Sequence, residues 1–205
     1  MRGFVINIKK TKNEDTIVTV LTENSVTDYW RFFGARHSIL QLGNLIDFEV
    51  KESKNNFMPN MRSLSHISFP WLFSNNHLLI WHNFIKLFEP HLNDTIELDS
   101  FYFNILLKSA QKWHKQNPKR LAIEAYMEML KFEGRLYDHG FCYVCEEVLS
   151  DEVGLMRAFL PAHPECIYAP ALNKQEIFTL FNTQSTIHIE NDTIEKLYSI
   201  LLKGL

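Results

Sequence analysis

The sequence contains few of the residues that interrupt regular structure, and few cysteines. Its 205 residues include only 7 Gly, 7 Pro and 3 Cys. Hydrophobic residues make up 46% and charged residues 22%, so collagen-like, coiled-coil and disordered chains are excluded. The sequence has no run of about 18 apolar residues, so we expect no membrane span. The remaining class is a folded globular protein of one large domain or a few small ones.

The sequence also shows no secretory signal. Polar residues interrupt the first ten positions too early for the apolar core of a signal peptide. An odd number of cysteines in a chain without an export signal argues against a disulfide framework. We therefore expect a cytoplasmic protein with no membrane partner, whose cysteines are better suited to binding a metal.

An excess of positive charge is absent as well, since the formal net charge is -3. Residues 1–72 nevertheless carry 9 Lys/Arg against 7 Asp/Glu, whereas residues 142–205 carry 4 against 9. Such asymmetry points weakly to a polyanion partner for the first part of the chain. An ordinary solvated surface explains it equally well, and charge alone does not decide between the two.

Short β-branched and aromatic runs dominate the first third of the chain. They predict strands over residues 4–8, 16–21, 28–33, 45–50 and 61–69, separated by polar turns. Five strands in about 70 residues suggest a small barrel of the OB type, an architecture that binds oligonucleotides. We assign this OB-fold domain to residues 1–72.

Helical periodicity begins after the predicted barrel. It predicts helices from Asn76 to about Glu89, over residues 100–116, from Pro118 to about Gly134, and over residues 174–181 and 193–203. Asn173 and Asp192 fit as N-caps of the last two. The fold class is therefore α+β, with a helical domain over residues 73–205 that carries a cysteine and histidine insertion at about residues 139–170.

The sharpest chemical signal is a pair of closely spaced metal-ligand motifs. Cys142 and Cys145 form one, and His163 and Cys166 form the other. Thiolates and imidazole at such spacing close a tetrahedron around zinc, and a site with all four positions filled by protein is structural. We predict a structural zinc ion at these four residues.

Other interpretations of this region stay open. The three thiols can instead pack as small hydrophobic groups, and His139 can replace His163 as a ligand. A redox pair is disfavoured because the expected βαβ context is missing. A zinc deaminase needs H-x-E before its cysteine pair, whereas His188 and Glu190 follow it here. No nucleotide-binding or hydrolase motif is present, so we predict no catalytic residues.

Basic residues near aromatic ones mark a candidate DNA surface on the barrel. The predicted phosphate contacts are Lys9, Lys10, Lys12, Arg31 and Arg36. Trp30, Phe32 and Phe33 lie between or beside the two arginines, as in single-strand binders, or they fill the barrel. Strand alternation predicts that at most one of the two sets, Trp30 with Phe32 or Arg31 with Phe33, is exposed. A second basic stripe, Lys108, Lys112 and Lys115, fits a solvated helix face or a continuation of this surface.

Two local patterns carry a resemblance to a known family. Residues 33–38, Phe-Gly-Ala-Arg-His-Ser, contain a glycine-x-arginine segment directly after the third predicted strand. Residues 133–142, Glu-Gly-Arg-Leu-Tyr-Asp-His-Gly-Phe-Cys, lead into the first cysteine pair. Both patterns, and the order of barrel, helices and cysteine insertion over essentially the full length, resemble the RecO family of bacterial recombination mediators. The chain is short for the family, its basic run after the glycine is reduced to Arg36 and His37, and its second metal pair begins with His163.

The resemblance implies a function that composition does not show. It implies a non-enzymatic protein that binds single- and double-stranded DNA and anneals complementary strands. With its partner RecR, such a protein helps to load RecA onto DNA coated by single-strand-binding protein. The alternatives are an interaction adaptor that binds only proteins and, less favoured, a zinc-dependent nucleic-acid enzyme.

Overall fold

A computed structural model describes residues 1–11, 13–36, 38–52, 58–93, 95 and 98–204. The chain divides into two compact units, Met1–His114 and Lys115–Leu205. The division into domains at residues 72 and 73 stays a prediction. In the described part of the chain, no helix combines the length and the apolar character needed to cross a bilayer.

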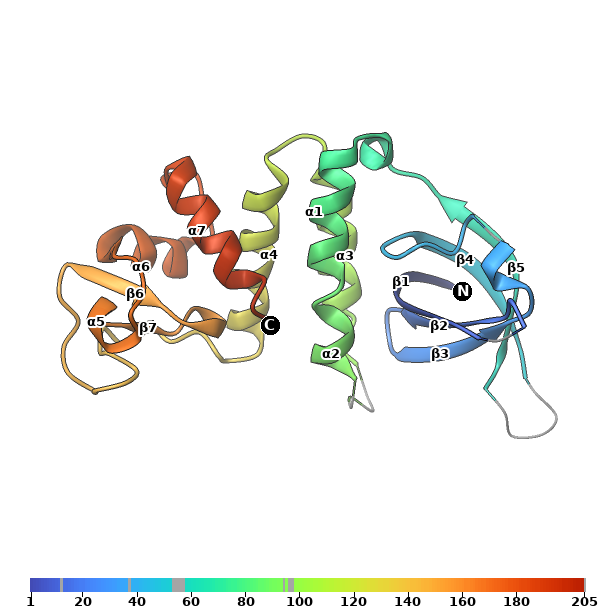
Figure 1. The fold of residues 1–205 in the computed structure, drawn as a ribbon, viewed down its shortest axis with the longest axis horizontal. Coiled ribbons are helices and arrows are strands. Elements are labelled where there is room, and N and C mark those ends of the chain that lie inside the picture. The colour runs from blue at the N-terminus through green and yellow to red at the C-terminus, as the bar shows by residue number, and fades with distance from the viewer. Residues whose placement is uncertain (12, 37, 53–57, 94, 96–97, 205) are drawn as a thin grey trace. The chain divides into compact units, whose positions relative to one another are not determined.

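The first unit begins with a closed five-stranded barrel (Figure 1). Its strands are β1 (Arg2–Lys10), β2 (Thr16–Leu21), β3 (Val26–Arg31), β4 (Leu45–Lys51) and β5 (Asn60–Ile67), in the order β1-β2-β3-β5-β4. All pairs are antiparallel except β3 with β5. Alternate residues point inward and form the core, which includes Val5, Val18, Val20, Tyr29, Ile46, Phe48 and Met61. The expected barrel and the α+β class are confirmed.

The third strand ends two residues before the predicted end at Phe33. Phe33 has a φ of 51°, in the left-handed region, so the extended backbone cannot continue through it. Its N–H donates to Asp15 Oδ1 (2.8 Å), and a short 3-10 helix, η1 (Gly34–Arg36), follows. The turn before β2 therefore determines where β3 stops.

Helices and three tryptophans complete the first unit. After η2 (Pro70–Phe73) come α1 (Asn75–Ile85), α2 (Phe88–Leu92) and α3 (Phe101–Lys112). The indoles of Trp71, Trp81 and Trp113 pack together, with ring centroids 4.9 to 6.2 Å apart. Trp81 Nε1 donates to the carbonyl of Gly43 (2.9 Å), where a Cβ would lie only 2.4 Å from that nitrogen. This glycine therefore lets α1 pack closely against the barrel.

The helix boundaries correct two sequence predictions. The first predicted helix was expected to stop near Glu89, before Pro90, but α1 ends at Ile85 and α2 contains Pro90. Proline is tolerated there because it is the third residue of α2, where a backbone N–H has no partner within the helix. The second predicted helix ends at Lys112 rather than near Gln116.

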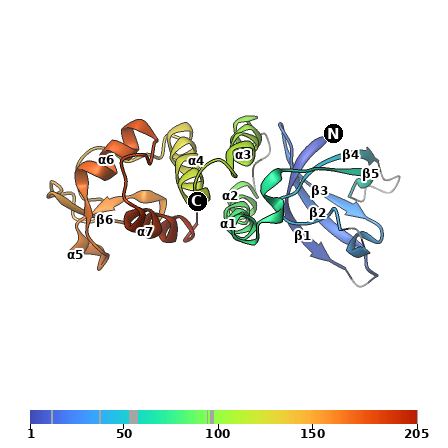
Figure 2. The same cartoon turned by 90° about the horizontal axis from the view of Figure 1, so that it is seen from above.

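The second unit combines helices with a small sheet (Figure 2). Its elements are α4 (Pro118–Phe132), β6 (Glu152–Leu155), η3 (Arg157–Phe159), β7 (Pro161–Ala162), α5 (Pro164–Ile167), β8 (Leu172–Asn173), α6 (Lys174–Thr183) and α7 (Asn191–Leu201). The sheet has the order β7-β6-β8. Asn173 caps α6 as predicted, accepting from Glu176 N–H (3.1 Å). The N-cap of α7 is Glu190 rather than Asp192, because that helix begins at Asn191.

Arg120 and Glu124 on α4 hold the segment between α6 and α7. The Arg120 guanidinium donates to the carbonyls of Thr186 and Ile189 and to Asn191 Oδ1. Glu124 Oε1 accepts from the backbone N–H and the hydroxyl of Thr186, at 2.9 and 2.8 Å. Charge-assisted bonds of this kind are stronger than neutral ones, so they fix the closing helix on α4.

Candidate metal centre and nucleic-acid interface

A tight turn brings Cys142 and Cys145 together. Cys142 N–H donates to the carbonyl of Glu147 (2.8 Å), and Glu146 N–H donates back to the carbonyl of Cys142 (2.9 Å). Glu146 has a φ of 63°, which closes the turn, and Phe141 pairs with Val148 across it. We call residues 141–148 the cysteine turn.

The second ligand pair lies where β7 leads into α5. His163 is the N-cap of α5 and Cys166 lies within it. Tyr143 N–H donates to the carbonyl of Pro161 (2.9 Å), which ties the cysteine turn to β7. As a result, one ligand atom from each of Cys142, Cys145, His163 and Cys166 lies within 4.8 Å of the others. The structure therefore assembles the predicted group, which can hold a metal ion.

His163, rather than His139, faces the thiols. Its Nδ1 lies 3.3 Å from Cys145 Sγ and 3.8 Å from Cys166 Sγ. Its Nε2 lies 3.1 Å from the carbonyl oxygen of Val148. A carbonyl only accepts, so the proton belongs on Nε2 and the Nδ1 lone pair faces the sulfurs, as metal-ligating histidines require. His139 is outside the cluster and contacts Asp138 at 3.5 Å.

The three thiols differ in how easily they ionise. Desolvation raises the pKa of Cys142, but hydrogen bonds, chiefly from the N–H groups of Cys145, His163 and Val144, outweigh it and bring the pKa to about 6. Desolvation together with the neighbouring Cys145 and Cys142 raises the pKa of Cys166 to about 11. Several thiolates at this distance repel one another, and a divalent cation bound between them offsets this repulsion. The donor set thus fits a metal with a preference for sulfur and nitrogen.

The chain around this cluster is acidic and partly apolar. Residues 142–156 contain four Asp/Glu and no Lys or Arg. The cysteine turn also exposes apolar side chains, those of Phe141, Tyr143, Val144 and Val148. A surface with this charge repels phosphates, so the metal centre is a poor candidate for DNA contact.

The histidine of the disfavoured zinc-deaminase interpretation does not belong to the cluster. His188 Nε2 contacts the carbonyl oxygen of Glu176 (3.0 Å). Among the described residues, the potential metal-ligating group contains neither His188 nor Glu190. Its four members instead come from the two predicted ligand pairs alone.

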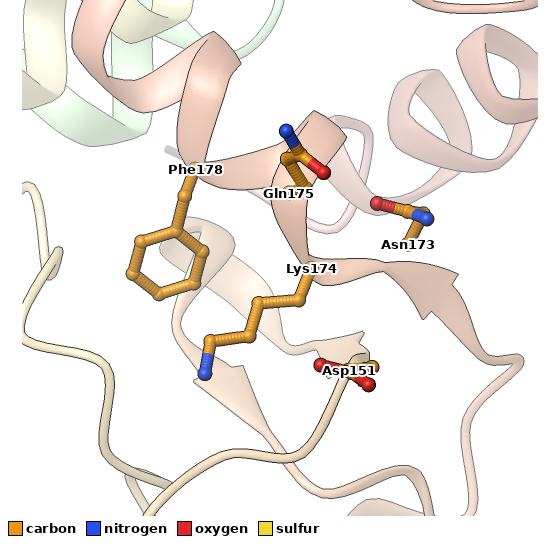
Figure 3. A pocket seen from close by; sticks show the side chains of 5 residues that line it. All are labelled: Asp151, Asn173, Lys174, Gln175 and Phe178. Carbon is orange, nitrogen blue, oxygen red and sulfur yellow. The ribbon is translucent and has the colours of Figure 1, made fainter.

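A surface pocket at the start of α6 is lined by four polar residues and one phenylalanine (Figure 3). It is lined by Asp151, Asn173, Lys174, Gln175 and Phe178. Lys174 Nζ donates to the carbonyl of Leu149 (2.7 Å) and lies 6.0 Å from the centre of the Phe178 ring. Asn173 is engaged as the cap of α6. These polar groups therefore hold α6 in place, and no reactive constellation is formed among the described residues that line the pocket.

The predicted DNA contacts that the structure describes lie at one end of the barrel. Lys9 and Lys10 are exposed at the end of β1. Strand register places Lys9 beside Ile17 and Ile17 beside Trp30, so these three residues form one cross-strand row. Lys12 lies outside the described residues. The two described lysines are thus near the end of β3, where the arginines were expected.

The two arginines have different surroundings. Arg31 Nη1 donates to the carbonyl of Met61 (2.9 Å), which links β3 to β5 and engages part of the guanidinium. Arg36 has a side chain that is 67% exposed, forms an ion pair with Glu14, and lies 5.3 Å from the centre of the Phe33 ring. Exposed ion pairs are weak, so Glu14 does not prevent Arg36 from contacting a phosphate.

The aromatic residues beside the arginines are not arranged as strand alternation predicts. Phe32 is 55% exposed and Phe33 is 56% exposed, so members of both predicted sets face solvent. Alternation fails because β3 ends at Arg31 and the following residues turn away from the strand. These two rings therefore do not fill the barrel.

The second basic stripe is exposed, as a solvated helix face would be. Lys108 and Lys112 face solvent on α3, and Lys115 is exposed after it. The next basic residues are engaged within the second unit, since Lys119 pairs with Glu195 and Arg120 holds the segment before α7.

Sequence reasoning missed the acidic residues that shape the barrel site. Asp15 holds the Phe33 N–H and Glu14 pairs with Arg36. Both belong to the turn between β1 and β2, which the sequence identified only as a turn. The carbonyl of Val148 was missed because its contact with His163 depends on backbone geometry, for which no residue type gives a signal.

Comparison with known proteins gives a family match for the first part of the chain. The family model described as RecO N terminal matches residues 1–72. No curated protein gave a match to this chain.

Proposed function

We propose that this protein is a non-enzymatic recombination mediator of the RecO family, because the RecO N-terminal family model matches residues 1–72. In this proposal it binds single- and double-stranded DNA and anneals complementary strands. With RecR it then assists the loading of RecA onto strands coated by single-strand-binding protein. Annealing needs no catalytic residue, because neutralising phosphates is sufficient to let two polyanions approach.

The observation that carries the proposal is the basic end of the barrel. Lys9, Lys10 and Arg36 are exposed there, beside exposed aromatic rings. OB-type barrels bind nucleic acid with this combination of cations and rings. We assign phosphate contacts to Lys9, Lys10, Lys12, Arg31 and Arg36, with the Arg31 guanidinium oriented by its bond to the carbonyl of Met61.

We assign the metal centre a structural role. Zinc at Cys142, Cys145, His163 and Cys166 would have all four positions filled by protein, which leaves none for water or substrate. Its contribution would be to fix the small sheet and α5 to the cysteine turn. The acidic surroundings support this role over contact with DNA.

Salt-dependent DNA binding tests the proposal. We expect labelled single-stranded DNA to bind with an affinity that falls steeply as salt rises, measured by fluorescence anisotropy. Replacing Lys9 and Lys10 by Ala should weaken binding and reduce the slope of log K against log salt by about 0.7 for each phosphate that is no longer neutralised. Arg36→Ala should act in the same direction.

Lys108→Ala with Lys112→Ala is the matched control. It removes two exposed lysines of the same unit from α3 and should leave the salt slope unchanged. Failure to bind at low salt would contradict the proposal. An equal weakening in the control would contradict the assignment of the phosphate contacts to the barrel.

A second candidate function is an interaction adaptor that binds only proteins. The cysteine turn favours it, because exposed apolar side chains beside carboxylates suit a protein partner better than a polyanion. Absence of salt-sensitive DNA binding, with the fold intact, would favour this candidate.

A further inference from the structure

Phe33 is held in an unusual conformation with its ring exposed. Its φ of 51° lies in the left-handed region, which a bulky residue seldom occupies, and 56% of the residue is exposed. A left-handed backbone costs energy at a bulky residue, and because the ring is exposed, its burial does not compensate for that cost. Strained residues of this kind persist where the surrounding structure imposes them, and they gather at binding and active sites.

The surrounding structure does impose the conformation. Asp15, itself only 8% exposed, accepts from the Phe33 N–H at 2.8 Å. Ala35 N–H donates to the carbonyl of Glu14 (2.9 Å). Gly34 is buried against Thr16, so the chain passes too close to β2 for any side chain at that position. The turn before β2 thus fixes the backbone on both sides of the ring.

Cations and further rings lie beside Phe33. The guanidinium carbon of Arg36 is 5.3 Å from the centre of the Phe33 ring. Phe32 is 55% exposed, and its ring makes an edge contact with Trp30 at 6.3 Å. Trp30 belongs to the cross-strand row that ends at Lys9. Flat apolar faces therefore alternate with positive charge, as they do on proteins that bind single strands.

We propose that Phe33 and Phe32 stack on unpaired bases, so that the barrel binds single-stranded DNA more tightly than duplex DNA. This inference rests on the proposed function, since it requires DNA to bind the barrel. Phosphate contacts alone do not detect whether the bases of a strand are paired. Aromatic rings do, because a duplex hides the faces of its bases, whereas a single strand exposes them.

A strand without bases separates stacking from phosphate contact. The probe is a labelled oligothymidine, compared with an abasic strand of the same length and with a duplex. We expect the native protein to bind the oligothymidine more tightly than the abasic strand. Phe33→Leu keeps an apolar side chain but removes the aromatic face, and should lower affinity for the oligothymidine between about five-fold and a hundred-fold. Phe32→Leu should act in the same direction.

The same variants should leave two other quantities unchanged. Affinity for the abasic strand and for the duplex should stay within about two-fold, and the salt slope should not move, because rings release no counterions. Phe33→Tyr should restore binding, since it keeps the ring. Phe73→Leu is the matched control: Phe73 is 90% exposed in the same unit and lies in η2, away from β3 in the sequence.

The outcomes distinguish this inference from the function on which it rests. If Phe33→Leu and Phe32→Leu bind all three probes as the native protein does, stacking is wrong and DNA binding stands. Equal weakening on all three probes also overturns stacking, because it indicates a change in the phosphate contacts. If the native protein binds none of the probes at low salt, the proposed function itself fails.

Discussion

Removal of zinc from the proposed four-residue site is expected to unfold much of the second unit. A chelator, or Cys142→Ser, should abolish the melting transition of this unit or shift it to far lower temperature. Structural zinc contributes on the order of 10 kcal/mol to the folding of small domains. Here zinc would replace repulsion between crowded thiolates by coordination, and one of the four ligands, Cys142, is fully buried. Elemental analysis for one zinc per chain, followed by circular dichroism on heating, measures the effect.

His139→Ala is the matched control for the metal centre. His139 lies three residues before Cys142 but outside the cluster, so metal content and the melting curve should be retained. DNA affinity of the barrel should also survive chelation, because the predicted contacts lie in the first unit. An unchanged melting curve after verified metal removal would refute the structural role.

Gly34→Ala is expected to have the second large effect, on the barrel and on its DNA surface. A Cβ at this position would lie 1.9 Å from Thr16 Oγ1 and 3.0 Å from Thr16 Cβ. Thr16 is buried, so the added atom must displace the backbone of η1 from β2. We expect a decrease of about 3 kcal/mol in the free energy of unfolding, a typical upper cost of overpacking. Urea unfolding measures it.

DNA binding should report the same displacement. Phe33 and Arg36 flank Gly34, so affinity for single-stranded DNA should fall even where the variant remains folded. Thr16→Ala removes the nearer of the two clashing atoms and should partly restore both stability and affinity in the double variant. Native stability and affinity in Gly34→Ala alone would show that the close approach has no such role.

The barrel was predictable because its strands follow local rules. Short β-branched runs separated by Asn, Asp and Ser turns set five strands, and inward-facing residues such as Val18 and Val20 alternate as expected. The end of β3 was not predictable in this way. It depends on Asp15, which is distant from Phe33 in sequence and acts through a hydrogen bond to the backbone.

The ligand pairs of the metal centre were visible as spacing, but the elements that join them were not. Strands as short as β7 and β8, with two residues each, give no periodic signal. The choice between His163 and His139 also needed the fold, since the bond from Tyr143 N–H to the carbonyl of Pro161 ties β7, and with it His163, to the cysteine turn. The prediction that the helix stops before Pro90 was wrong because the position of a proline within a helix, rather than its presence, decides whether the helix ends there.

The two candidate sites have opposite charge and separate proposed roles. The barrel exposes lysine, arginine and aromatic side chains, whereas residues 142–156, which contain the cysteine pair, carry four Asp/Glu and no Lys or Arg. The family model described as RecO N terminal matches residues 1–72, which include the first of these sites. We therefore expect DNA binding and strand annealing to depend on the basic residues of the barrel.

Annealing of complementary strands tests the central claim most directly. Two labelled oligonucleotides are mixed with and without the protein, in the absence of any nucleotide cofactor, and pairing is followed by energy transfer between the labels. We predict that the protein accelerates pairing and that the acceleration declines with salt. It should also decline in a variant with Lys9, Lys10 and Arg36 replaced by Ala, but not in Lys108→Ala with Lys112→Ala. Strands that pair no faster with the native protein, although it binds them, would contradict the proposed mediator function.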